Sequence, residues 1–308
     1  MAFKVLVSDP LAPDAVAAMR DANLSVDEKT DLTADQLIAE IPAYDAIMVR
    51  SATKVRKPVI DAASRLKLIV RAGVGLDNVD VEYARSKGIT VRNTPSASSN
   101  SVAELALGHM FSLARNIGRG TVSMKQGKWE KKALKGVEID GKTLGIIGIG
   151  RIGQLLATKA EALGMKVIAF DAFVDKSPLP HLVEMTDLAD LLARSDFVSL
   201  HIPFDPERGA TIGSDEIASM KDGAFLVNCA RGGVVDETAL NTALTAGKLA
   251  GAALDVFAQE PPETEAPLLE QPALSLTPHI GASTKEAQAR VGNEAAAIVI
   301  EISREVSA

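Results

Sequence analysis

Three polar residues in the second half of the chain have side chains suited to acid–base and anion chemistry. Arg231 follows the apolar run FLVNCA, Glu260 follows ALDVFAQ, and His279 follows SLTP, so each comes just beyond a predicted buried strand. A guanidinium can bind a carboxylate and polarise a carbonyl oxygen, while an imidazole can move a proton. A carboxylate beside that imidazole favours its protonated form and fixes its orientation. Together the three groups would suffice to oxidise a 2-hydroxy acid or to reduce a 2-oxo acid.

Each of these residues also has a structural alternative: a solvated turn arginine, a surface glutamate before a rigid proline pair, and a histidine that hydrogen-bonds within its loop. The chain has four histidines. His109 lies within a helical run and is interpreted as packing, and His181 lies in a proline-flanked loop. His201 stands at a strand end and could line a cofactor cleft. His201 is therefore the main alternative to His279 as the proton-transferring residue.

A glycine-rich loop provides the strongest local signal. Gly148, Gly150 and Gly153 form G-x-G-x-x-G directly after an apolar strand, and Asp171 ends the next strand. In a dinucleotide-binding unit the first glycine permits a tight turn, the second lets the pyrophosphate approach, and the third lets helix and strand pack closely. The helix N-terminus supplies N–H groups to the pyrophosphate. The acid would bind the adenosine ribose and repel a 2′-phosphate, and no Lys or Arg follows it until Lys176, so NAD is predicted.

A glycine-rich turn without a ligand is the simplest alternative for this loop, and S-adenosylmethionine enzymes also place an acid at the second strand. Those enzymes have a looser glycine pattern. The combination of strand, loop, helix, second strand and acid in one unit favours NAD.

Short β-branched runs alternate with helical stretches along the chain, which predicts an α/β protein with two doubly wound parallel-sheet domains. A Ser- and Asn-rich break at 94–101 separates them. Helices are expected over 102–120 and, at the end, over 284–306. The expected strands span residues 3–9, 46–51, 66–72 and 89–93, then 142–150, 166–171, 196–203, 223–230, 250–257 and 273–278.

The composition excludes several classes of protein. Lys and Arg number 33 against 40 Asp and Glu, a net charge of −7, which argues against a nucleic-acid surface. The single cysteine, Cys229, excludes an intrachain disulfide framework and a cysteine-rich metal site, and no metal is expected. The start lacks a signal-peptide pattern, and no window has the roughly 18 apolar residues of a membrane span. A soluble, cytoplasmic protein is expected.

Several segments in the right order resemble the D-isomer-specific 2-hydroxyacid dehydrogenase family. These are GKTLGIIGIGRIG, NCARGGVVDE, AGAALDVFAQEPP and TPHIGASTKEAQ. The last of them, with VRSATKV, RAGVGLDNVD and MKQGKWEKK, is similar to the D-3-phosphoglycerate dehydrogenase branch. The similarity covers essentially the whole chain. It implies a flavodoxin-like substrate-binding domain made of residues 1–98 plus 285–308, with a Rossmann NAD-binding domain, 99–284, inserted into it.

The resemblance implies that Arg231, Glu260 and His279 are the catalytic set, with His279 reaching into the cleft between the two domains. Besides the glycine loop, the NAD contacts that it implies come from Val74, Arg151, Ile152, Asp171, Ile202, Pro203, Cys229, Ala230, Arg231, Asp255, His279, Gly281 and Ala282.

Cations at the strand ends of the first domain suggest how an acidic chain could hold an anionic substrate. Arg50 and Arg71 each end a predicted strand, and Ser51 and Lys54 lie beside the first of them. They would hold a phosphate and a carboxylate, although each alone could be a solvated strand end. With Ala72 and Gly73, which lie in one of the resembling segments, they form the expected substrate-binding set.

The expected reaction is therefore the NAD-dependent oxidation of D-3-phosphoglycerate to 3-phosphohydroxypyruvate, the first step of serine biosynthesis. The alternatives are a glyoxylate or hydroxypyruvate reductase, another D-2-hydroxyacid dehydrogenase and, from a different class, an NAD-sensing protein similar to the C-terminal-binding-protein corepressors. Formate dehydrogenases of this fold are disfavoured, because they carry Gln in place of Glu260.

The resemblance also implies assembly and regulation. It implies a homodimer or homotetramer, in which Lys131 or Lys132 on a basic arm around Trp129 could add to a neighbouring subunit's site. Longer members continue into regulatory domains, one of which binds serine, whereas this sequence ends at Ala308. We expect a short form, or a piece of a longer protein, that serine does not inhibit.

Overall fold

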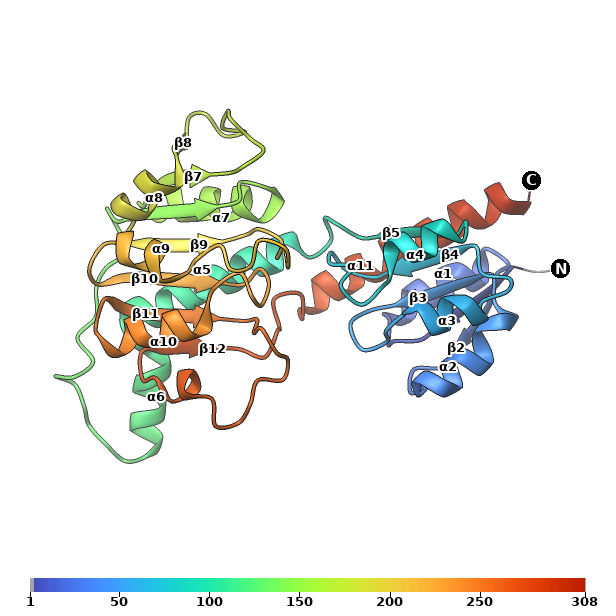
Figure 1. The fold of residues 1–308 in the computed structure, drawn as a ribbon, viewed down its shortest axis with the longest axis horizontal. Coiled ribbons are helices and arrows are strands. Elements are labelled where there is room, and N and C mark those ends of the chain that lie inside the picture. Colours follow the sequence, from blue (N-terminus) through green and yellow to red (C-terminus); the bar gives the residue numbers. More distant parts are fainter. Residues whose placement is uncertain (1–2, 308) are drawn as a thin grey trace. The chain divides into compact units, whose positions relative to one another are not determined.

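The computed structural model describes residues 3–307, which divide into two units with separate cores (Figure 1). The first unit comprises Met1–Ser99 and Ala282–Ala308, and the second is Asn100–Gly281. Each contains one parallel sheet with helices on both faces, which confirms the predicted α/β class with two doubly wound domains. The expected boundaries lie within a few residues of these divisions. The assignment of substrate and cofactor roles to the two units stays a prediction.

The sheet of the first unit has five parallel strands in the order β2-β1-β3-β4-β5. They are β1 (Lys4–Val7), β2 (Ser25–Glu28), β3 (Ala46–Val49), β4 (Leu68–Arg71) and β5 (Thr90–Asn93). This is the flavodoxin-like order, whose topological switch point lies between β1 and β3. The central strands are almost wholly apolar because both of their faces are covered.

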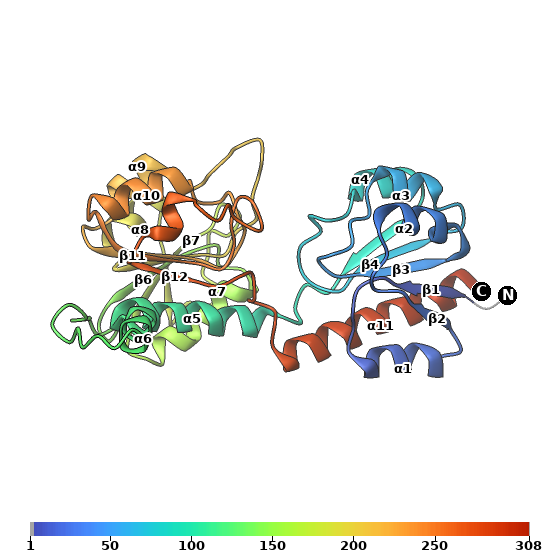
Figure 2. The same cartoon turned by 90° about the horizontal axis from the view of Figure 1, so that it is seen from below.

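Helices cover both faces of this sheet. α1 (Pro13–Asp21) and α11 (Lys285–Ser307) pack together on one face. On the other face lie α2 (Ala34–Glu40), α3 (Lys57–Ala62) and α4 (Val81–Ser86), as Figure 2 shows. A short 3₁₀ helix, η1 (Ile41–Ala43), leads into β3. The C-terminal helix therefore completes a core that the first hundred residues begin.

The sheet of the second unit has seven parallel strands in the order β12-β11-β10-β9-β6-β7-β8. They are β6 (Thr143–Ile147), β7 (Lys166–Phe170), β8 (Val183–Met185), β9 (Phe197–Leu200), β10 (Ala224–Asn228), β11 (Leu249–Leu254) and β12 (Leu274–Leu276). The chain runs outward from β6 to β8 and then returns to β9 on the other side of β6. This Rossmann topology has its switch point between β6 and β9.

Two layers of helices enclose this second sheet (Figure 2). α5 (Ser99–Arg115) and α7 (Arg151–Glu161) pack on one face. α8 (Leu188–Arg194), α9 (Ser214–Ser219) and α10 (Glu237–Thr245) pack on the other. α6 (Ile117–Lys125) follows α5, and a 3₁₀ helix, η2 (Pro267–Glu270), precedes β12.

The prediction of one helix over 102–120 is wrong. The helix breaks at Asn116, whose φ of 53° lies in the left-handed region, and α6 begins at the next residue. Asparagine tolerates this conformation better than most residues. Strands β2 and β8 were also missed. Among the described residues, no helix is long and apolar enough to cross a membrane. The same residues contain no group of three or more His, Cys, Asp or Glu side chains that could hold a metal ion.

Candidate active site

The three polar residues singled out in the sequence follow three neighbouring strands of the second unit. Arg231 follows β10, Glu260 follows β11 and His279 follows β12, and these strands are adjacent and parallel. Their carboxyl ends therefore meet at one edge of the sheet. Ligands of open α/β sheets bind beyond this edge.

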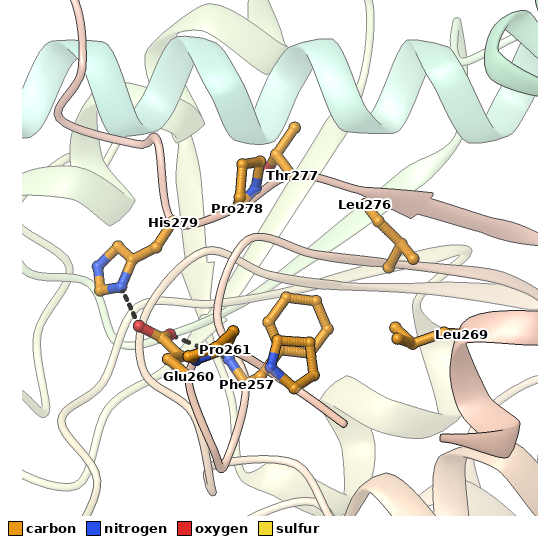
Figure 3. A pocket seen from close by; sticks show the side chains of 9 residues that line it. Phe257, Glu260, Pro261, Leu269, Leu276, Thr277, Pro278 and His279 are labelled. Atoms are coloured by element: carbon orange, nitrogen blue, oxygen red, sulfur yellow. Dashed lines mark hydrogen bonds and ion pairs between the residues drawn. The ribbon is translucent and has the colours of Figure 1, made fainter. Parts of the chain in front are cut away.

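The structure brings Glu260 and His279 into direct contact. His279 Nδ1 lies 2.7 Å from Glu260 Oε2, and both side chains are partly exposed. A dashed line marks this contact in Figure 3. The other carboxylate oxygen, Oε1, accepts a hydrogen bond from the Phe257 amide at 3.1 Å. Because an ionised carboxylate only accepts, Nδ1 carries a proton and Nε2 is left to exchange a proton with a substrate.

A buried carboxylate holds the turn that carries His279. This residue has a φ of 53°, and its amide donates to the Asp255 carbonyl oxygen at 2.8 Å. The Asp255 side chain is 1% exposed. Its Oδ1 accepts from the Thr277 hydroxyl at 2.6 Å and from the Ile280 amide at 2.8 Å, and its Oδ2 accepts from the Gly281 amide at 2.8 Å. Asp255 thereby fixes a left-handed turn that is uncommon for a residue with a side chain.

Backbone contacts also shape the loop that carries Arg231. The Asn228 side chain donates to the Arg231 carbonyl and accepts from the Ala230 amide, at 2.9 and 3.0 Å. The Arg231 guanidinium donates to the Ala230 carbonyl at 2.7 Å. A Cβ at Gly232 would overlap the carbonyl oxygen of Phe257. Glycine is therefore required where the loops after β10 and β11 pass each other.

A cavity of about 440 Å³ adjoins the Glu260–His279 pair. Most of its wall is apolar, and Figure 3 shows the Glu–His pair on one side with Leu269 and Leu276 on the other. The remaining lining residues are Phe257, Pro261, Pro262, Thr277 and Pro278. The pair therefore has an apolar wall within its own unit.

The glycine loop has the geometry that a bound dinucleotide requires. Gly148 has a φ of 95°, and a Cβ there would come within 2.7 Å of the His201 carbonyl oxygen. A Cβ at Gly153 would overlap the Gly148 carbonyl oxygen, so α7 packs closely on β6. At Gly150, which precedes the first residue of α7, a Cβ would meet nothing within 4 Å. The loop is therefore tight at the first and third glycines and open at the second, as a pyrophosphate site requires.

Asp171 lies beyond the end of β7, beside the glycine loop. Its Oδ2 accepts from the Ile149 amide and its Oδ1 from the Phe173 amide, each at 2.9 Å. Each carboxylate oxygen retains capacity for a further hydrogen bond. The position and the remaining acceptor capacity fit the ribose hydroxyls of NAD.

The other residues expected to contact NAD lie near the same sheet edge, with two exceptions. Arg151 and Ile152 begin α7, while Ile202 and Pro203 follow β9 at the switch point. Cys229 and Ala230 follow β10 and are buried, and burial raises the pKa of the Cys229 thiol. The exceptions, Val74 and Ala282, belong to the first unit. Their contacts with the cofactor stay predictions.

The structure does not favour His201, the alternative proton-transferring residue. Its Nε2 lies 2.9 Å from the Ser199 hydroxyl, and its Nδ1 is buried with no hydrogen-bond partner among the described residues. Burial lowers the pKa of His201 to about 4, so the ring is neutral at physiological pH. Among the described residues no carboxylate forms an ion pair with it, in contrast to His279.

The predicted substrate-binding cations lie on neighbouring strands of the first unit. Arg50 directly follows β3, and Arg71 is the last residue of β4, where it pairs with Val49. Arg71 donates to the Ser51 hydroxyl at 3.2 Å, and a Cβ at Gly73 would overlap the Arg71 guanidinium. The missing side chain of Gly73 thus leaves room for that guanidinium. Ala72, which lies between the two residues in the sequence, is buried. Lys54 is exposed further along the same loop.

Two residues that the sequence analysis missed hold this loop. The buried Asp9 carboxylate accepts from the amides of Arg50 and Thr53 and from the Thr53 hydroxyl. On the other side, the Asn78 side chain donates to the carbonyl oxygens of Arg50 and Thr53, at 2.9 and 2.7 Å. The position of Asp9 at the end of the first predicted strand could have identified it. The loop that carries Arg50 and Ser51 is therefore ordered by hydrogen bonds from two sides.

The basic arm around Trp129 contains no helix or strand between α6 and β6. Trp129 is 78% exposed, and Lys131 and Lys132 are exposed as well. A contribution of either lysine to a neighbouring subunit's site stays a prediction.

The second unit has a Rossmann sheet, a glycine loop with room for a pyrophosphate, and a histidine–carboxylate pair at the same sheet edge. These features together define an NAD-dependent oxidoreductase. Residues 107–281 match the family described as "D-isomer specific 2-hydroxyacid dehydrogenase, NAD binding domain". The chain belongs to this family, and NAD is its cofactor.

Known relatives agree on the family and differ in substrate. The chain is 51% identical to a hydroxypyruvate reductase of Thermotoga maritima, over 95% of each chain. It is 49% identical to a D-3-phosphoglycerate dehydrogenase of Methanocaldococcus jannaschii, over 94% of this chain but only 55% of that protein. It thus spans about half the length of that relative. D-lactate dehydrogenase of Aquifex aeolicus, solved with NAD and lactic acid, has a TM-score of 0.86 and 31% identity, over 98% of this chain and 96% of that one.

Proposed function

We propose that the chain catalyses the NAD-dependent oxidation of D-3-phosphoglycerate to 3-phosphohydroxypyruvate, the first step of serine biosynthesis. The observation that carries this proposal is the cation cluster of the first unit. Arg50 directly follows β3 and Arg71 ends the adjacent β4. Ser51 hydrogen-bonds to Arg71, and Lys54 is exposed on the loop after β3. In a chain with a net charge of −7, such a cluster suits a substrate with both a phosphate and a carboxylate.

The residues at the edge of the second sheet have complementary roles in this proposal. Arg231 binds the substrate carboxylate beside the reacting carbon. His279 Nε2 takes the proton of the 2-hydroxyl, while Glu260 holds the ring through Nδ1 and stabilises the imidazolium that forms. Bound NAD supplies the acceptor for the hydride that leaves C2, so the products are the 2-oxo acid, NADH and one proton. Asp171 and the glycine loop hold the cofactor.

A hydroxypyruvate or glyoxylate reductase is the second candidate, and a specific observation favours it. The chain is 51% identical to the Thermotoga maritima hydroxypyruvate reductase, a similarity as high as the 49% to the Methanocaldococcus jannaschii phosphoglycerate dehydrogenase. Both candidates use the same family chemistry. They differ in whether the cation cluster receives a phosphate.

The deciding experiment compares kcat/KM for 3-phosphoglycerate and D-glycerate with NAD, and for hydroxypyruvate and glyoxylate with NADH. A preference for the phosphorylated acid supports the first candidate. Preference for the unphosphorylated acids supports the reductase. Binding of NADH without turnover of any of the four acids would instead support the NAD-sensing alternative. A homodimer or homotetramer, a cytoplasmic location and insensitivity to serine stay predictions.

A further inference from the structure

A histidine outside the proposed catalytic set lies buried behind the His279 turn. His109 is on α5 and is 4% exposed. Its Nε2 lies 3.0 Å from the Thr277 hydroxyl, and its Nδ1 lies 2.9 Å from the Ser275 hydroxyl. Both partners are on or next to β12, the strand that leads to His279. The sequence interpretation of His109 as a packing residue is therefore incomplete.

The direction of the hydrogen bond between His109 and Thr277 follows from the Asp255 carboxylate. The single proton of the Thr277 hydroxyl is donated to Asp255 Oδ1, at 2.6 Å. That hydroxyl can then only accept from His109, so Nε2 carries a proton and donates it. Burial lowers the pKa of His109, more than the nearby Asp255 charge raises it. A chain of donors therefore runs from α5 through Thr277 to Asp255.

The chain ends on the backbone of the proposed catalytic turn. Asp255 accepts from the amides of Ile280 and Gly281, and its own carbonyl accepts from the amide of His279. These bonds hold His279 at a φ of 53°. Side-chain networks in a dry interior reinforce one another, so the loss of one member weakens the others.

We propose that His109 is a positioning residue: it fixes the Thr277 hydroxyl and, through Asp255, the backbone turn that presents His279. The effect on turnover rests on the proposed function, whereas the effect on the turn does not. Within the described residues no hydrogen bond joins His109 to Glu260 or His279, so the proposed effect passes through Thr277 and Asp255.

The test measures amide hydrogen exchange at Ile280 and Gly281 by NMR, with the Leu226 amide in the centre of β10 as an internal reference. His109→Phe keeps the bulk of the ring and removes the donor, whereas His109→Gln keeps a donor in the place of Nε2. Thr277→Val removes the next link. We expect exchange at Ile280 and Gly281 to be about fivefold to tenfold faster in His109→Phe and Thr277→Val, the effect of one lost hydrogen bond. Exchange at Leu226 should be unchanged, and His109→Gln should resemble the unmodified protein.

Ser275→Ala is the matched control. It removes the other hydrogen bond of His109, together with the bond from the Ser275 hydroxyl to Ser112, but leaves the link to Thr277 intact, so exchange in the turn should not change. Equal acceleration at Leu226 in His109→Phe, or the same acceleration in Ser275→Ala, would show a general loss of packing and overturn the proposal. Unchanged exchange at Ile280 and Gly281 would also overturn it.

Turnover provides the second readout. With whichever of the four acids the enzyme turns over, His109→Phe and Thr277→Val should each lower kcat about threefold to tenfold, and the double variant should lose no more than either single variant. Additive losses would contradict an action through Thr277. If the unmodified protein turned over no substrate, the proposed function would fail, and the exchange experiment would still decide the role of His109.

Discussion

At the scale of single residues, the Glu260–His279 pair separates two candidate bases. We expect His279→Asn to lower kcat about 10²- to 10⁴-fold, because it removes the group that takes the hydroxyl proton. His201→Asn should leave most of the turnover, since His201 is neutral above its pKa of about 4 and no carboxylate within residues 3–307 pairs with it. Steady-state kinetics of both variants provide the measurement. If His279→Asn kept its kcat and His201→Asn lost it, the assignment of His279 as the base would be wrong.

The cation cluster makes a different kinetic prediction. Arg50→Ala should mainly raise KM for 3-phosphoglycerate, with a smaller change in kcat. The rise in KM should correspond to a loss of about 1.5–3 kcal/mol of binding free energy, the contribution of one charged hydrogen bond. The rise in KM for D-glycerate should be much smaller. Arg85→Ala is the control, because Arg85 is exposed on α4 and pairs only with Glu82 among the described residues. An equal rise in KM for the phosphorylated and the unphosphorylated acid would show that Arg50 does not bind the phosphate.

The sequence could predict the polar residues at strand ends, but not the buried polar residues that support them. Arg231, Glu260 and His279 were found because each follows an apolar run that marks a strand end. The contact between Glu260 and His279 depends on the path of two loops, which no local pattern specifies. The position of Asp9 at a strand end was a usable signal, but nothing in the sequence shows that its side chain is buried. His109 had no such signal, because the sequence does not show which hydrogen bonds a helical histidine makes.

At the scale of elements, two glycines of the loop after β6, Gly150 and Gly153, should respond differently to substitution. Gly153→Ala pushes α7 away from the Gly148 carbonyl, so we expect a lower melting temperature as well as weaker NADH binding. Gly150→Ala adds a methyl group to open space, so the melting temperature without cofactor should hardly change. Its Kd for NADH should rise at least about tenfold, a change of about 1.4 kcal/mol.

Calorimetry and NADH fluorescence titration of the two variants test this difference. If Gly150→Ala and Gly153→Ala lost equal stability without cofactor, the position beside Gly150 would not be open, and it would not be available to a pyrophosphate. Undiminished NADH binding by Gly150→Ala would contradict the proposed pyrophosphate position directly.

The elements that the sequence analysis missed share a physical cause. β2 (SVDE) and β8 (VEM) are short strands at the edge of their sheets, and each mixes apolar with charged residues. Their interior neighbours are covered on both faces and are therefore nearly all apolar, which makes them easy to recognise. The break at Asn116 was missed because the apolar pattern continues across it. A left-handed residue interrupts the helix there without changing the composition.

At the scale of the whole molecule, two histidines with lowered pKa values predict how stability depends on pH. His201 binds a proton near pH 6.5 when unfolded but only near pH 4 when folded, and the pKa of His109 is also lowered by burial. Below about pH 6.5 the unfolded chain therefore binds more protons, so stability falls as the pH falls towards 4. The slope should reach at most about 1.4 kcal/mol per pH unit for each histidine.

Urea unfolding between pH 7.5 and 4.5 measures this slope. His201→Asn should reduce it, because asparagine takes up no proton in either state. An identical slope in that variant would show that His201 already titrates normally in the folded protein.

The division of the chain into two units has a consequence for its synthesis. The core of the first unit includes Val5, Val7 and Met19, but also Val291, Ala295 and Val299 of α11. The ribosome makes the first group early and the second group only after the entire Asn100–Gly281 unit. The Rossmann unit is continuous and can fold as soon as it emerges. The first sheet must instead wait, with the face that α11 will cover still open to solvent, until α11 has emerged from the ribosome.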